Sequence, residues 1–99
     1  MKRKFRVTFE LDGNEIDDGV IELDQRVIDQ VDDEWRSFFY PSIKTPEQIA
    51  SIIARCMCVF NSKLSDLDGF ADLSNDMAQM IEYPQGLDDF DVTAKEVKP

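Results

Sequence analysis

The N-terminal segment KFRVTFEL, residues 4–11, most constrains the fold, because it alternates strictly between polar and apolar side chains. A period of two is typical of a β-strand that buries one face. The next three residues, Asp12 to Asn14, form a turn signal between apolar runs, so we expect the chain to return as a second strand. The sequence therefore predicts a hairpin whose apolar face other elements must cover.

Two stretches with helical spacing follow the hairpin. Asp24 is the expected N-cap of the first helix, which ends before Pro41 and has an apolar stripe that comprises Ile28, Val31, Trp35 and Phe38. Thr45, Pro46 and Gln48 form a capping box with proline at the first helical position, which predicts the start of a second helix. Its expected apolar face comprises Ile49, Ile52, Ile53, Cys56, Met57, Phe60 and Leu64, and Cys58 points away from it.

The C-terminal third contains one ambiguous and one clear element. Residues 77–83, MAQMIEY, fit either a strand or a short helix. Residues 90–97 alternate again and predict a final strand, which could pair with the first. Together these elements predict a single α+β domain over residues 1–99. The elements follow in the order ββααββ. We expect a two-layer fold in which an antiparallel sheet of three to four strands packs on two helices.

Charge is unevenly distributed along the chain. The net charge is −10, yet Lys2, Arg3, Lys4 and Arg6 lie within the first six residues. Residues 14–35 hold nine acids and one Arg, and residues 66–91 hold eight acids and no base. Two carboxylates on alternate strand residues, about 6.6 Å apart, repel by about 0.6 kcal/mol in water. Such a surface should repel nucleic acid, phosphate-bearing substrates and anionic membranes, and attract a basic protein.

The residue types present argue against an enzyme. The chain has no His, and no Gly-rich phosphate loop, so imidazole bases and phosphate cradles are excluded, and we expect no cofactor. Nothing in the sequence separates one carboxylate from the others, as acid–base catalysis requires. Cys56 and Cys58 alone do not form a zinc site. With no apolar run of about 20 residues and no secretory signal, we expect a cytoplasmic protein.

The segment SDLDGFAD, residues 65–72, has two interpretations. Asp66, Asp68 and Gly69 resemble the middle of a calcium loop, but Leu64 and Asn75 fall where the first and last oxygen ligands belong. The alternative is an acidic turn in which Gly69 adopts a positive φ and Phe70 enters the core. We predict no metal site.

The crowded carboxylates are the candidate binding residues. Carboxylates on a rigid scaffold can replace phosphates in a groove lined by Lys and Arg, and aromatic residues beside them would anchor the contact. The candidates are Glu15, Asp17, Asp18, Glu22, Asp29, Asp32, Asp33 and Glu34, with Phe39, Tyr40 and Tyr83 as anchors. The alternative is an adaptor or homodimeric domain that binds through an apolar patch and uses its acids only for solubility. The oligomeric state stays open.

In size, charge and architecture the whole chain resembles the small acidic anti-defence proteins encoded by phages, of which anti-CRISPR proteins are the best-known examples. The resemblance implies an inhibitor that occupies the basic nucleic-acid channel of a defence complex, in some members by mimicking DNA. It rests on no motif, so it assigns no role to any residue. Acidic immunity proteins that block basic nuclease toxins are similar to this chain to nearly the same degree.

Overall fold

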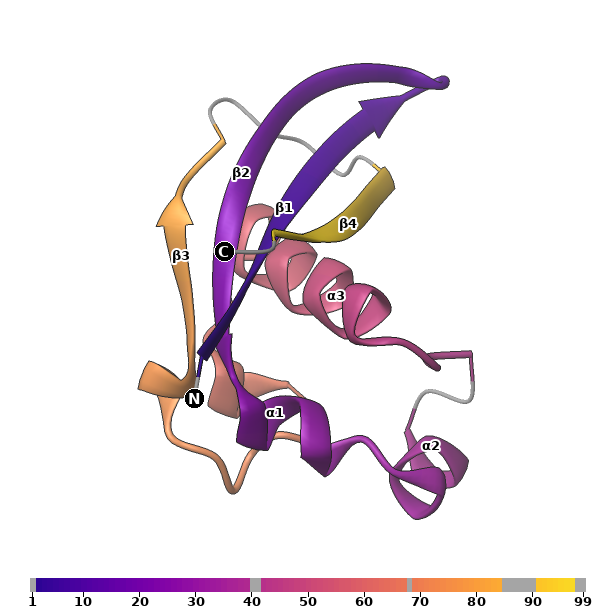
Figure 1. Ribbon diagram of the computed structural model, residues 1–99, viewed down its shortest axis with the longest axis vertical. Coiled ribbons are helices and arrows are strands. Elements are labelled where there is room, and N and C mark those ends of the chain that lie inside the picture. The colour runs from indigo at the N-terminus through magenta and orange to yellow at the C-terminus, as the bar shows by residue number, and fades with distance from the viewer. Residues whose placement is uncertain (1, 40–41, 68, 85–90, 98–99) are drawn as a thin grey trace.

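In the computed structural model, which describes residues 2–39, 42–67, 69–84 and 91–97, four strands form one antiparallel sheet (Figure 1). The strands are β1 (Lys2–Leu11), β2 (Asn14–Asp24), β3 (Ala78–Glu82) and β4 (Asp91–Val97), in the spatial order β3-β2-β1-β4. The predicted α+β class is confirmed, and so is the pairing of the first strand with the last. The ambiguous residues 77–83 contain a strand.

The hairpin turn follows the sequence signal. Asp12 and Gly13 have φ angles of 53° and 81°, so both central residues of the turn are left-handed. This backbone matches the twist of the two strands that it joins, and Asp and Gly are among the residues that adopt it most readily. Of the strand residues, Phe5, Val7 and Phe9 are fully buried on one face of the sheet.

The helix α3 (Pro46–Val59) packs against β4, β1 and β2 and completes the core. Its start is the predicted one, because the Thr45 hydroxyl accepts from the backbone N–H of Gln48 and the Gln48 side chain accepts from that of Thr45. The expected apolar face, however, is rotated. The buried residues are Ile49, Ala50, Ile53 and Ala54.

Small side chains explain the rotation. Ala50 and Ala54 let α3 approach the sheet closely, and this face continues through Met57 and Cys58, which pack against the core. Cys58 therefore does not point away, as expected. Phe60 is exposed, with the Arg55 guanidinium 5.5 Å from its ring centroid, and Leu64 is buried outside the helix.

The prediction of a single helix between Asp24 and Pro41 is wrong. The chain forms two helices there, α1 (Gln25–Gln30) and α2 (Asp33–Phe38). Asp24 caps α1 as predicted. Asp32 is extended and its carboxylate accepts from the Trp35 backbone N–H at 2.8 Å, so it starts a new helix rather than continuing the old one. Val31 and Trp35 stay buried, but Phe38 becomes 74% exposed.

The segment between α3 and β3 contains two short 3-10 turns, η1 (Leu64–Asp66) and η2 (Asn75–Met77). Between them Gly69 has a φ of 89° and Phe70 is buried, as the acidic-turn interpretation expected, while Asp68 lies outside the described residues. The indole N–H of Trp35 donates to the Gly69 carbonyl at 2.9 Å. This bond ties α2 to the segment. None of the described helices has the length and apolar character to cross a bilayer.

Candidate functional site

Two of the eight candidate carboxylates are neutralised by the strand beside them. On the outer face of the sheet, Arg6 forms an ion pair with Asp18 at 2.5 Å, and Lys2 lies 3.7 Å from Glu22. The antiparallel register of β1 and β2 brings the basic N-terminus alongside the acidic return strand. These two carboxylates therefore serve the sheet, and the repulsion expected along this strand is largely offset.

The remaining candidates separate into two groups at opposite ends of the molecule. Glu15 and Asp17 lie near the hairpin turn, whereas Asp29 and residues 32–34 lie on α1 and α2 beyond the far end of β2. Figure 1 shows the turn and α2 at the two ends of the longest axis. The strand residues from Glu15 to Asp24 span about 30 Å at about 3.3 Å per residue. The eight carboxylates thus do not form one face.

The end that carries α1 and α2 holds the larger group, which we call the acidic end. It comprises the exposed carboxylates Asp29, Asp32, Asp33, Glu34 and Asp72. Asp72 comes from the distant segment after Gly69 and reaches this end through Gln30, whose side-chain amide donates to it at 3.1 Å. In the described part of the chain, Asp33 alone of the five forms an ion pair with a Lys or Arg.

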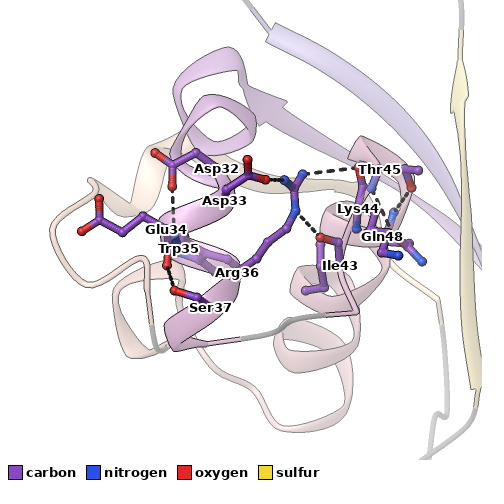
Figure 2. Close-up of polar contacts among 10 residues, drawn as sticks. All are labelled: Asp32, Asp33, Glu34, Trp35, Arg36, Ser37, Ile43, Lys44, Thr45 and Gln48. Atoms are coloured by element: carbon purple, nitrogen blue, oxygen red, sulfur yellow. Dashed lines mark hydrogen bonds and ion pairs between the residues drawn. The ribbon is translucent and has the colours of Figure 1, made fainter.

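That cation, Arg36, is turned to the other side of α2. Its guanidinium donates to the Ile43 carbonyl at 2.6 Å, to the Lys44 carbonyl at 3.4 Å and to Asp33 at 3.1 Å. Figure 2 shows Arg36 reaching toward residues 43–45, with Asp32 and Glu34 on the opposite side of the helix. Arg36 therefore holds the backbone before α3 and forms no ion pair with Asp32 or Glu34 among the described residues.

Next to these two carboxylates the surface is hollowed. The depression holds about 250 Å³ and is lined by Gln30, Asp32, Glu34, Trp35, Phe38 and Phe39. Trp35 is only 5% exposed, and its ring lies 5.3 Å from that of Phe39 and 5.2 Å from that of Phe70, measured between centroids. We call this depression the Trp35 hollow. Its lining combines acidic with aromatic residues.

Two of the three expected aromatic anchors, Phe39 and Tyr83, lie at separate hollows. Phe39 is 43% exposed and lines the Trp35 hollow, whereas Tyr40 lies outside the described residues. Tyr83 is exposed beside a separate hollow at the C-terminal end of α3, with Met57 and Asn61. Sequence reasoning missed Phe38, which it assigned to the core, and Asp72. The exposure of Phe38 could have been predicted from Asp32. An N-cap at Asp32 starts a new helix, so Phe38 no longer continues the apolar stripe that begins at Ile28.

The two cysteine thiols of α3 ionise less readily than free thiols. Both cysteines are half-buried, and burial raises the pKa of Cys58 to about 11 and also raises the pKa of Cys56. Within the described ranges, no three acidic or cysteine side chains are grouped to hold a metal ion.

The pKa of Cys58 has a measurable consequence. In a Cys56→Ser variant at pH 8, about one Cys58 thiol in a thousand is ionised, so alkylation by iodoacetamide should be at least about 100-fold slower than in the urea-unfolded chain. Because the folded-state pKa is raised, the rate should increase about tenfold per pH unit up to about pH 11. A rate that levels off near pH 9 would contradict this prediction.

Comparison with protein-family models, with curated proteins and with solved structures found no match to this chain. The roles of its residues follow from their geometry and charge.

Proposed function

We propose that this chain is a non-enzymatic inhibitor that docks its acidic end on the basic nucleic-acid-binding site of another protein. The observation that carries this proposal is the acidic end itself, with exposed carboxylates beside exposed Phe38 and Phe39, while Arg36 is bound on the other side of α2. The exposed carboxylates repel one another, and a cationic surface that docks on them relieves this repulsion. Such a pair of surfaces favours fast, salt-dependent association. The aromatic rings add the apolar contact that a stable complex needs.

The partner class follows from charge and from resemblance. A groove that binds phosphates is lined by Lys and Arg, and carboxylates on a rigid scaffold can occupy it. The similarity in size, charge and architecture to phage-encoded anti-defence proteins favours a defence complex or a nuclease as the target. Direct binding to nucleic acid or to an anionic membrane is disfavoured by the net charge of −10.

Affinity capture from a bacterial lysate tests the proposal. Immobilised protein should retain a nucleic-acid-binding protein at about 50 mM salt and lose most of it at about 500 mM, because screening shortens the range of the attraction. Added duplex DNA should release the same protein by competing for its basic site. A partner that stays bound at high salt and ignores DNA would contradict the proposal.

One observation favours the second candidate, a homodimer or adaptor. Among the described strands, β4 pairs with β1 alone, so its other edge is unpaired. A depression of about 420 Å³, lined among others by Ile43, Ile52 and Val92, lies between this strand and α3. An edge strand beside a groove can accept a further strand. Sedimentation over a wide concentration range tests the homodimer, which requires a dimeric mass that does not depend on salt.

A further inference from the structure

We infer that the Trp35 hollow is a receptor for one arginine side chain of the partner. This inference rests on the proposed function and specifies its central contact. The lining of the hollow supports it, because it combines the acidic residues Asp32 and Glu34 with the aromatic residues Trp35, Phe38 and Phe39. A guanidinium is the cation that best satisfies both kinds of group, because it binds carboxylates with two parallel hydrogen bonds and stacks on aromatic faces.

The carboxylates keep acceptor capacity for such a ligand. One oxygen of Asp32, Oδ1, accepts from the Trp35 backbone N–H and fixes the position of the carboxylate. Its other oxygen, and both oxygens of Glu34, accept no hydrogen bond from the described residues. Figure 2 shows both carboxylates on the side of α2 that faces away from Arg36. A ligand therefore meets a negative site that the chain's own cation does not occupy.

The Trp35 part of the aromatic lining is held in place before binding. The Trp35 indole N–H is already bonded to the Gly69 carbonyl, and Gln30 donates to the same oxygen at 3.3 Å. Ring contacts to Phe39 and to Phe70 restrain the indole further. A preformed aromatic surface needs little reorganisation to receive a flat cation, which favours affinity.

The size of the hollow matches one side chain. A guanidinium has four heavy atoms, and if each takes about the 30 Å³ of a liquid water, the group fills about 120 Å³. The hollow of about 250 Å³ has room for this group and part of its methylene stem. An ammonium would also be attracted, but it is more strongly hydrated and cannot form the parallel pair of bonds. The geometry therefore selects arginine over lysine.

A titration with N-acetyl-L-arginine methylamide tests the receptor. Trp35 is the single Trp of the chain, so its indole N–H signal in a nitrogen–proton correlation spectrum reports on the hollow without ambiguity. We expect a saturable shift of this signal. The corresponding lysine derivative should bind at least about fivefold more weakly and the neutral citrulline derivative should give no saturable shift, at matched ionic strength.

Matched variants show whether the site is specific. Glu34→Gln and Phe38→Ala change exposed side chains and should each weaken arginine binding at least fivefold. Glu15→Gln makes the same charge change at the hairpin end and should leave binding unaltered. Equal binding of arginine and citrulline, or equal weakening by Glu34→Gln and Glu15→Gln, would overturn the inference.

Peptides separate failure of this inference from failure of the proposed function. Nona-arginine should bind the protein more tightly than nona-lysine, and the excess should disappear in Phe38→Ala. Equal, salt-dependent binding of both peptides would overturn the arginine receptor but leave docking by the acidic end intact. Binding of neither peptide at low salt would overturn both.

Discussion

Replacing Gly69 by Ala should lower the free energy of unfolding by about 3 kcal/mol, a large part of the roughly 5–15 kcal/mol available to a domain of this size. Two effects add. The φ of 89° is left-handed, which costs a residue with a Cβ about 1–2 kcal/mol. In addition, the new Cβ would lie 2.6 Å from the Cε2 atom of Trp35 and closer still to its Nε1, and overpacking costs about 1–3 kcal/mol.

Gly13 provides the matched control. Its φ of 81° is nearly the same, but a Cβ there would meet nothing within 4 Å. Gly13→Ala should therefore cost only the conformational part, about 1 kcal/mol. Urea unfolding of both variants measures the difference, which reports the contact with Trp35. Equal losses of stability would show that no such contact exists.

A double-mutant cycle checks the physical cause. Phe lacks the indole Nε1 atom, which lies nearest to the added Cβ, and also the Cζ2 atom, so Trp35→Phe should relieve part of the clash. The double variant Gly69→Ala, Trp35→Phe should then lose less stability than the sum of the two single variants. Because Trp35 also forms the floor of the Trp35 hollow, Gly69→Ala should weaken arginine binding as well.

Local signals in the sequence predicted the fold well. Alternation in residues 4–11, the Asp-Gly turn and the capping box at Thr45 each involve neighbouring residues, so they can be recognised without knowledge of the tertiary contacts. The prediction of one helix between Asp24 and Pro41 was wrong because Asp32 acts as an N-cap in the middle of an apolar stripe with helical spacing. Asp33 and Glu34, which follow it in the first turn, favour a helix start there through the helix dipole.

The candidate site was predictable only in part. The acidic residues are visible in the sequence, but their division between two ends follows from the length of β2, and the neutralisation of Asp18 and Glu22 follows from its register with β1. The Trp35 hollow depends on Gly69 meeting both Gln30 and Trp35 across more than thirty residues of chain. No local pattern encodes that contact.

Charge reversal at the acidic end should abolish most binding to a basic partner. In the double variant Asp29→Lys, Glu34→Lys, each change removes one attraction and adds one repulsion, and exposed pairs are worth about 0.2–1 kcal/mol each. The total of about 3 kcal/mol corresponds to about 100-fold in affinity for nona-arginine at about 50 mM salt. Both residues are exposed and neither is an N-cap, so the fold should persist.

The control is a double reversal with the same charge change at the other end. Glu10 and Glu15 face each other across β1 and β2, and replacing both by Lys also changes the net charge from −10 to −6. If the whole molecule attracts the partner through its net charge, the two double variants should lose affinity equally. If the acidic end is the contact, the hairpin variant should lose less than about fivefold, because its charges lie farther from the docked peptide than the Debye length of about 14 Å at this salt concentration. Calorimetric titration of both variants decides between a local docking surface and a uniformly acidic protein.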